Sequence, residues 1–430
     1  MAKLNDLLAS HDAILAVVDG RLPVSSAARF HHLLLRLRDE LGAGQDADVW
    51  LASAPGRTEL AGNHTDHNRG RVLAASVQLD SIAAVVPRDD GVVQFASAGF
   101  PLVQVDLSST DPREREREST AALVRGVAAG FRAAGHRIGG FNATVGSTVL
   151  PGSGLSSSAS IEVLLGAIFS SLYNGGAVSS TEIAKIGQYA ENSYFGKPSG
   201  LMDQLACATG GAIAIDFADL AAPNIDRVEV SFEDAGLALL VVETGGTHAD
   251  LTDEYAAIPR DMRTIASALG GEVLRDIDAE AFFAAVPRLR REIGDRPVSR
   301  AIHFFQENVR VEQMVDALRN GDMGEYLSLM AESGRSSGLY LQNCVPAGSP
   351  EQQGIVVALA LTERFFAREG LRTGRTAACR VHGGGFAGTI QVLLPRDRVD
   401  RYATFVSSYL GEEAVTSISI RKTGATALHG

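Results

Sequence analysis

The sequence predicts an α+β fold divided into two domains, and three observations carry this prediction. The chain has 430 residues, which is more than one hydrophobic core usually supports. Strand-like and helix-like stretches occur in both halves, without the strict alternation typical of a doubly wound sheet. The segment AAPNIDR at 221–227, near the middle of the chain, is a candidate boundary, with expected strands beyond it. We therefore predict one domain over 1–225 and a second over 226–430.

Composition and charge restrict the class of protein. Hydrophobic residues make up 45% and charged residues 21% of the chain, as in ordinary globular proteins. The net charge of −12 argues against a nucleic acid or an anionic membrane as partner. The three cysteines are far apart in the sequence, which favours a reducing compartment over a disulfide framework or a zinc site. With no signal sequence and no apolar run of about 18 residues, we expect a cytoplasmic enzyme, a monomer or weak homodimer, that acts on small molecules.

The expected elements of the first half begin with helices over 5–42. A strand from residue 49, a polar loop over 54–70 and a further strand or short helix follow. Residues 81–88 and 92–97 are expected to pair as a β-hairpin around an Asp-Asp-Gly turn. The remaining elements expected here are a helix over 119–135, a strand over 141–149, helices over 158–173 and 181–191, a short helix at 202–203 and a strand over 211–217.

The second half is expected to begin with strands and then to become mainly helical. Its expected elements are strands over 228–232 and 237–244, helices as far as residue 370, strands over 376–381 and 389–395 around a glycine turn, a helix from Arg396 and a strand over 414–420.

A glycine- and serine-rich stretch, LPGSGLSSS over 150–158, precedes a helix with an apolar face. The first turn of a helix has unpaired N–H groups and a partial positive charge. Gly152 and Gly154 let the backbone approach an anion closely, and the serines add hydroxyl groups. The stretch is neither a Walker A loop nor a dinucleotide-binding fingerprint. From these residues alone, a phosphate cradle and a structural capping loop are both open.

The segment APGRTELAGNHTDHNRG over 54–70 concentrates hydrogen-bond donors and acceptors between apolar strands. Recognition of a sugar needs many directional hydrogen bonds of this kind. A metal site at His64, Asp66 and His67 is disfavoured, because their close spacing makes joint ligation awkward. A purely structural polar turn stays open as the alternative reading.

Four stretches of the chain together resemble the GHMP family of small-molecule kinases. Pro-x-Gly-x-Gly-Leu-Ser-Ser-Ser-Ala resembles the ATP-binding motif of that family. The segment 54–70 is similar to the galactokinase signature Gly-Arg-x-Asn-x-Ile-Gly-Glu-His-Thr-Asp-Tyr-Asn-x-Gly. GLMDQLACATGG from Gly200 and HGGGFAGTIQVLLP from His382 complete the set, which covers residues 52–395.

The resemblance implies both a fold and a reaction. The fold is that of a GHMP kinase, with a ribosomal protein S5 domain 2-like N-terminal domain, which here carries extra N-terminal helices, and a ferredoxin-like C-terminal domain. The active site is expected between the two domains. The implied reaction is ATP-dependent phosphorylation of galactose at the anomeric hydroxyl, which gives α-galactose 1-phosphate and ADP.

The resemblance also implies roles for individual residues. Asp203 matches the catalytic aspartate, and Arg57 matches the arginine that keeps it ionised. The glycines at 383–385 are expected to approach the site from the second domain. Residues implied to bind the sugar are Asn63, His64, Asp66, Asp203 and Tyr255. Residues implied to bind ATP are Gly152, Ser153, Gly154, Leu155, Ser156, Ser157 and Ser158, and those implied to hold Mg²⁺ are Ser158 and Glu191.

Two positions depart from the galactokinase signature beside the expected sugar site. Asn63 stands where the signature has glutamate, and Glu59 stands where it has asparagine. The glutamate of the signature is expected to hold the 6-hydroxyl of the sugar, so an amide there could favour a modified C6, and Glu59 could return a carboxylate to the pocket. The alternatives are therefore a kinase for another sugar or a uronic acid, and a non-catalytic sugar and ATP sensor. The sensor is disfavoured because Ser158 and Ala159 complete the ATP motif.

Overall fold

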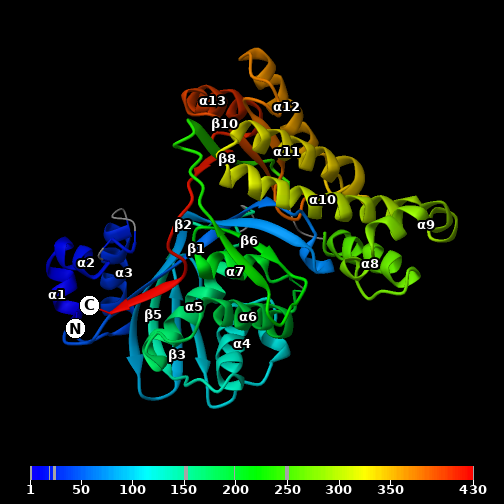
Figure 1. Ribbon diagram of the computed structural model, residues 1–430. Helices are drawn as coiled ribbons and strands as arrows, with labels where there is room; N and C mark the ends of the chain where they lie inside the picture. Colours follow the sequence, from blue (N-terminus) through cyan, green and yellow to red (C-terminus); the bar gives the residue numbers. More distant parts are fainter. Residues whose placement is uncertain are drawn as a thin grey trace.

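The computed structural model describes residues 2–18, 20–22, 26–149, 154–197, 199–246 and 251–429. Within these residues the chain forms an eight-stranded sheet and a four-stranded sheet, and helices pack against both (Figure 1). No helix in these described ranges is long and apolar enough to cross a membrane.

The large sheet is organised around one long strand, β2 (Arg71–Arg88). Its first half pairs with β6 and its second half with β5, while β1 runs antiparallel along its other edge. The order across the sheet is β12-β1-β2-β5-β3-β4, with β7 beside β6. The other strands of this sheet are β1 (Trp50–Ala61), β3 (Val92–Ser97), β4 (Val103–Asp106), β5 (Gly140–Ser147), β6 (Ala212–Asp216), β7 (Asn224–Val228) and β12 (Thr426–His429).

The predicted hairpin between 81–88 and 92–97 is wrong. β5 lies between β2 and β3, antiparallel to β2 and parallel to β3, and β3 forms its antiparallel pair with β4 instead. The Asp-Asp-Gly turn does reverse the chain, but β5, which is buried over its first six residues, pairs with both strands. A local turn signal cannot reveal a partner that arrives some fifty residues later in the chain.

Helices cover both faces of the large sheet. Alternate residues of β1 and β2 point to opposite sides, so Ala52 and Ala83 join one core while Leu51 and Ala84 join another. The first core is covered by α4 (Thr120–Ala133), α5 (Ser157–Asn174), α6 (Ser180–Ala190) and α7 (Met202–Thr209). The second is covered by the N-terminal helices α1 (Leu4–Ala9), α2 (His11–Val18) and α3 (Ser26–Leu41).

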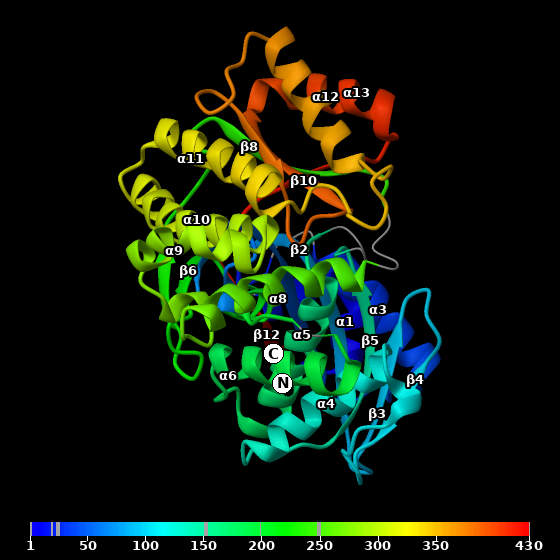
Figure 2. The ribbon, with the colours of Figure 1, turned by 90° about the vertical axis from the view of Figure 1, so that its right-hand side faces the viewer.

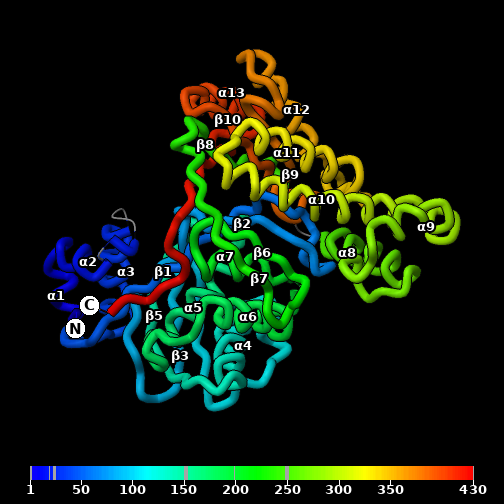
Figure 3. Tube along the Cα trace, in the orientation of Figure 1, coloured from blue at the N-terminus to red at the C-terminus, as the bar shows by residue number. Residues whose placement is uncertain are grey.

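The small sheet has the order β11-β8-β10-β9. Its strands are β8 (Leu237–Glu243), β9 (Ala378–Val381), β10 (Thr389–Pro395) and β11 (Val415–Ile418). The strand predicted over 228–232 is wrong, because the chain pairs with β6 only through β7 and then turns toward β8. The segment from 426 to 429 was not predicted as a strand, yet it returns to the large sheet and pairs with β1 (Figure 3).

The remaining helices are α8 (Thr252–Ala268), α9 (Ala279–Glu292), α10 (Asp295–Arg319), α11 (Met323–Ser336), α12 (Gly354–Arg368) and α13 (Val399–Leu410). Some of them cover the small sheet and join it to the large one, whereas α8 and α9 pack against α10 (Figure 2). α12 and α13 share a core with one face of the small sheet. Apolar residues of α10 and α11 share a core with the other face and with the ends of β1 and β2. The division into domains 1–225 and 226–430 stays a prediction, and β12 adds a late segment to the first sheet.

Candidate active site

A buried ion pair lies where the two sheets meet. Arg57 on β1 donates two hydrogen bonds to Asp203 in the first turn of α7, from Nε to Oδ1 at 2.7 Å and from Nη2 to Oδ2 at 2.8 Å. Burial by itself would raise the pKa of Asp203, but the guanidinium of Arg57 lowers it below its ordinary value. The carboxylate is therefore ionised at neutral pH.

The described part of the serine loop lies directly on this ion pair. The Gly154 carbonyl accepts a hydrogen bond from Nη1 of Arg57 at 2.5 Å, and the Leu155 carbonyl accepts one from the Arg57 backbone N–H at 3.0 Å. The hydroxyl of Ser156 donates to Oδ2 of Asp203. Two other residues that the sequence assigned to ATP, Gly152 and Ser153, lie outside the described residues.

The loop leads into the N-terminus of α5. Ser156 is in the left-handed region with a φ of 58°, and its side chain makes no capping hydrogen bond to the helix because it points to Asp203. The first N–H groups of α5 therefore have no side-chain cap from the described residues. A helix terminus of this kind binds anions such as phosphate. Ser157 and Ser158 are in the same first turn.

Two glycines allow the loop to approach its neighbours. A Cβ on Gly56 would lie 2.8 Å from the Leu155 carbonyl oxygen, so only glycine fits where the loop crosses β1. Gly154 has a φ of +71°, and a Cβ there would clash with the hydroxyl of Thr389 on β10. Both close approaches bring the loop, β1 and β10 together at the site.

A cluster of polar groups surrounds Glu191 at the start of the π-helical turn η3 (Glu191–Phe195). Its Oε1 accepts hydrogen bonds from the Ser158 hydroxyl at 2.8 Å and from Nζ of Lys197 at 3.0 Å, and its Oε2 accepts one from Gln204 at 2.9 Å. Mg²⁺ prefers a few protein oxygens together with phosphate oxygens, so Ser158 and Glu191 fit such an ion. In the described part of the chain, no group of three or more His, Cys, Asp or Glu side chains forms a larger metal site.

Sequence reasoning missed three members of this cluster. Gln204 also donates to Oε2 of Glu162 at 2.9 Å, and so links Glu162 on α5 to Glu191. Burial raises the pKa of Glu162 well above its ordinary value, and the neighbouring Glu191 adds to that effect. Lys197 brings a cation next to the carboxylate of Glu191. Gln204 follows Asp203 in the quoted Met-Asp-Gln motif, which is the signal that could have identified it.

The expected polar loop over 54–70 is shorter than predicted, because β1 continues to Ala61. Pairing with β2 satisfies the backbone of this stretch, so Arg57 and Glu59 are strand residues. Beyond the strand, the side chain of Asp66 is mostly buried against Gly200, where any larger residue would clash with its carboxylate. The structure therefore places Asp66 beside the loop that leads to Asp203.

The glycine turn between β9 and β10 reaches the polar segment from the small sheet. The ring nitrogen Nε2 of His64 lies 2.9 Å from the Gly384 carbonyl oxygen, and the Tyr255 hydroxyl donates to the Gly385 carbonyl at 2.9 Å. Burial lowers the pKa of His64 to about 3, with help from the nearby His67, so His64 is neutral. These contacts bring the turn at residues 383–385 to the polar segment, and its approach to the active site stays a prediction.

A buried histidine at the start of this turn is a further residue that sequence reasoning missed. His382 lies 3.0 Å from the hydroxyl of Thr58 through Nε2 and 3.0 Å from the hydroxyl of Thr389 through Nδ1. Burial lowers its pKa well below the ordinary value. His382 is thus a neutral hydrogen-bonding bridge from the small sheet to β1.

The hypothesis that Glu59 returns a carboxylate to the sugar pocket is wrong. Glu59 is only 3% exposed, and its carboxylate forms an ion pair with the fully buried Arg380 of β9. Asn63 is also fully buried and donates to Glu59 at 3.0 Å. The Glu59 carboxylate is therefore engaged by protein groups at the contact between the two sheets.

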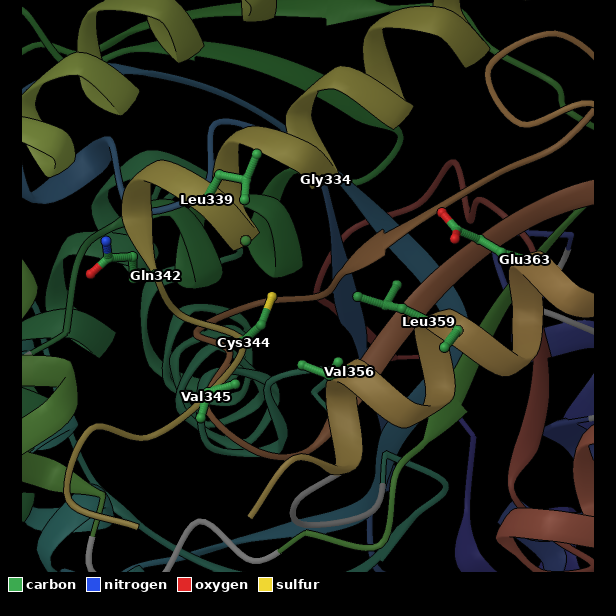
Figure 4. A pocket seen from close by; sticks show the side chains of 10 residues that line it. Gly334, Leu339, Gln342, Cys344, Val345, Val356, Leu359 and Glu363 are labelled. Atoms are coloured by element: carbon green, nitrogen blue, oxygen red, sulfur yellow. The ribbon is translucent and has the colours of Figure 1, made fainter. Parts of the chain in front are cut away.

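A separate cavity of about 590 Å³ lies between α12 and the end of α11 with the following π-helical turn η5 (Ser337–Leu341). Figure 4 shows apolar side chains around it, including Leu339, Val356 and Leu359, with Gln342 and Glu363 at its edges. Arg57 and Asp203 do not line this cavity. It is therefore distinct from the candidate active site.

Comparison with known families supports the resemblance seen in the sequence. A model of the GHMP kinases N terminal domain matches residues 122–211, which include the serine loop over 150–158 and Asp203. A model of the galactokinase galactose-binding signature matches residues 40–87, which include Arg57 and the polar segment.

Comparison with individual proteins extends the match over most of the chain. A galactokinase of Streptomyces coelicolor is 35% identical over 368 residues, which are 85% of this chain and 89% of that protein. The crystal structure of Lactococcus lactis galactokinase complexed with galactose superposes with a TM-score of 0.76 at 25% identity, covering 91% of this chain and 98% of that one. A mevalonate kinase structure superposes with a TM-score of 0.59 at 14% identity, covering 86% of this chain and 99% of that one, and shows the shared fold.

These matches confirm the predicted GHMP kinase fold, with its mixture of helices and strands. They also confirm the predicted family, because the match to the Streptomyces coelicolor protein extends well beyond the short motifs. The chain belongs to the galactokinase family of GHMP kinases, the ATP-dependent small-molecule kinases.

Proposed function

We propose that the protein transfers the γ-phosphoryl group of ATP to the anomeric hydroxyl of galactose, giving α-galactose 1-phosphate and ADP. The observation that carries this proposal is the Asp203 carboxylate, held by Arg57 and Ser156 at the N-terminus of α5. Relatives named as galactokinases, one of them solved with galactose, favour galactose over another sugar or a uronic acid.

Phosphoryl transfer to a hydroxyl needs alignment, charge neutralisation and a proton acceptor. In our proposal Asp203 accepts the proton of the anomeric hydroxyl as the oxygen bonds to the γ-phosphorus. Arg57 keeps Asp203 ionised and fixes the direction of its oxygens through two hydrogen bonds. Arg57 also stabilises negative charge on the transferred group, because its guanidinium lies between Asp203 and the serine loop.

The phosphates of ATP are proposed to bind at the start of α5. The backbone N–H groups of Ser156, Ser157 and Ser158 and the hydroxyl of Ser157 supply donors there, and the helix adds a partial positive charge. Gly154 and Leu155 complete the described part of the cradle through their contacts with Arg57.

Ser158 and Glu191 are proposed as the residues that would hold Mg²⁺. The ion, when bound, neutralises charge on the phosphate oxygens. Ser158 and Glu191 already share a hydrogen bond of 2.8 Å, so both oxygens lie beside the helix terminus. Lys197 supplies a second positive charge at this point through its contact with Glu191.

The sugar is proposed to contact His64, Asp66, Asp203 and Tyr255. His64 and Tyr255 contact carbonyls of the glycine turn, and Asp66 lies against Gly200, close in sequence to Asp203. We also propose that the enzyme works in the cytoplasm as a monomer or weak homodimer. The net charge of −12 supports the proposal that it has no nucleic-acid partner.

Consumption of ATP in the presence of Mg²⁺ tests the substrate. Galactose, glucose, 2-deoxygalactose and galacturonic acid are supplied separately, with a reaction lacking sugar as the control. We expect the highest kcat/KM with galactose and formation of the 1-phosphate. A higher kcat/KM with galacturonic acid, or tight sugar binding without ATP consumption, would contradict the proposal.

A further inference from the structure

Three consecutive carbonyl groups of the glycine turn are held by side chains assigned to the sugar site. Gly383 accepts a hydrogen bond from Nδ2 of Asn63 at 2.6 Å. The Gly384 carbonyl oxygen lies 2.9 Å from Nε2 of His64, and the Gly385 carbonyl accepts a hydrogen bond from the Tyr255 hydroxyl at 2.9 Å. The turn is thus fastened residue by residue to groups that border the expected sugar position.

The turn is also tightly packed against its surroundings. The Phe386 N–H donates to the Asn343 carbonyl at 2.5 Å. A Cβ on Gly384 would lie 2.6 Å from the Tyr255 ring, and one on Gly385 would clash with the backbone of Asn343. The turn has little freedom to move while these contacts persist.

Protein groups saturate the side-chain amide of Asn63. A carboxamide has two N–H hydrogens and two carbonyl lone pairs. The Nδ2 group donates to Gly383 and to Glu59, at 2.6 and 3.0 Å. The Oδ1 atom accepts from Asn343 at 2.8 Å and from Ser337 at 3.3 Å. Because Asn63 is also fully buried, its amide has no hydrogen-bonding capacity left for a sugar hydroxyl.

Glu59 completes the contact from the other side. Its carboxylate accepts from the Asn63 amide and forms an ion pair with Arg380, which is fully buried in β9. Arg380 also donates to the Leu60 carbonyl at 3.1 Å and to Ser333 at 3.2 Å. The series of contacts from Asn63 through Glu59 to Arg380 therefore ties the polar segment to the small sheet.

The two residues that depart from the galactokinase signature are thus hydrogen-bonded to each other. The signature has asparagine and then glutamate four positions later, whereas this chain has Glu59 and then Asn63. One carboxylate and one carboxamide are present in either arrangement. Only their positions are exchanged, so the carboxylate of this chain lies toward Arg380.

We propose that Asn63 is a positioning residue that holds the glycine turn, and that it forms one functional unit with Glu59 and Arg380 and does not bind the sugar. The inference rests on the proposed galactokinase function and specifies which residues do not select the 6-hydroxyl group. Asn63 acts on the reaction through Gly383, and so through the neighbouring carbonyl that contacts His64.

Comparing galactose with 6-deoxygalactose separates positioning from sugar binding. In Asn63→Ala we expect kcat/KM to fall about tenfold or more for both sugars, because buried partners lose their hydrogen bonds. The ratio of the two kcat/KM values should stay within about twofold of the wild-type ratio. A ratio that shifts by about tenfold toward 6-deoxygalactose, the effect of losing one hydrogen bond to the sugar, would overturn the proposal. Asn142→Ala, a mostly buried asparagine on β5, is the matched control.

Exchange of the pair tests the functional unit without relying on activity. Asn63→Glu places two carboxylates in contact, and Glu59→Asn leaves Arg380 without the carboxylate of its ion pair. We expect each single variant to melt below the wild type, and the double variant E59N/N63E to melt above both. If the double variant loses as much Tm as the two single variants together, or more, the proposal that these residues form one functional unit is overturned. If the wild type fails to phosphorylate any galactose, the proposed function fails, while these melting temperatures still decide the pairing.

Discussion

The contact of Arg57 with Asp203 makes the carboxylate a well-oriented but weak base. Arg57 lowers the pKa of Asp203 below its ordinary value, so the carboxylate cannot remove a sugar proton before the reaction begins. The hydroxyl becomes acidic only as its oxygen bonds to phosphorus. A proton acceptor fixed by two hydrogen bonds suits such a late transfer, in which positioning counts for more than basicity.

Asp203→Asn removes the proposed proton acceptor while preserving the size of the side chain. We expect kcat to fall by about 10²- to 10⁴-fold, the usual range for loss of a general base. The affinity for galactose should change only a few-fold, because the amide still offers hydrogen bonds. Steady-state kinetics and calorimetric titration with galactose measure the two effects. Asp89→Asn, at an exposed turn, is the control, and a kcat for Asp203→Asn near the wild-type value would refute the assignment.

At the scale of elements, the N-terminus of α5 depends on close packing against β10. Gly154 has a φ of +71° and no room for a Cβ beside Thr389. Gly154→Ala should displace the loop and raise KM for ATP about tenfold or more, with little change in galactose binding. Gly175→Ala at the other end of α5 is the control, because its φ is +61° but no atom lies within 4 Å of a new Cβ. Equal KM values for ATP in the two variants would contradict the role of the packing.

β12 links the end of the chain to the N-terminal helices. Leu428 is 3% exposed and lies in the core formed by those helices and the large sheet. Leu428→Ala should reduce the free energy of unfolding by about 2–5 kcal/mol and lower Tm by several degrees. Leu220→Ala, at a residue that is 48% exposed, is the control. If both variants melt at the same temperature, β12 contributes little to stability.

Periodic elements were predictable from the sequence, whereas their partners were not. The helix expected over 158–173 is found at Ser157–Asn174, since its apolar face repeats with the helical period. The end of β1 is predicted as a loop because the strand is buried on both faces and therefore shows no alternation of polar and apolar residues. Its polar residues bond to groups that are distant in the sequence. β12 is four residues long, which is too short for a recognisable pattern.

The same limit applies to the site. The motifs identified Arg57 and Asp203 by resemblance, although the two are 146 positions apart. The role of Asn63 was not predictable, because its partners Asn343 and Gly383 are 280 and 320 positions away. A single sequence shows that an amide replaces a carboxylate, but not which groups surround it.

At the scale of the whole molecule, the site lies on a buried polar interface between the two sheets. Glu307 of α10 accepts hydrogen bonds from the Gly62 N–H at 3.2 Å and from Ser333 at 2.7 Å. His303 of the same helix lies 2.9 Å from the Asn63 carbonyl oxygen and 2.8 Å from the Ser336 hydroxyl. Packing of the two sheets and the geometry of the polar segment over 54–70 are therefore coupled.

This interface makes the stability of the molecule sensitive to mild acid. Burial lowers the pKa of His64 to about 3 and also lowers the pKa values of His303 and His382. In the unfolded chain each histidine binds a proton near pH 6.5. Below that pH the unfolded state holds more protons than the folded state, so the free energy of unfolding falls as pH falls. The slope is about 1.4 kcal/mol per pH unit for each histidine that stays neutral.

We therefore expect Tm to be nearly constant between pH 8 and 7 and to fall steadily from about pH 6.5 to 5. Asp203 cannot cause this loss, because its pKa is lowered and its contribution disappears only under more acidic conditions. Thermal melting across this range measures the slope. His303→Gln should lower Tm at pH 7.5 but flatten the dependence on pH by one histidine, whereas His32→Gln, at an exposed position, should change neither. A Tm that stays constant to pH 5 would mean that protonation of these histidines is not coupled to separation of the two sheets.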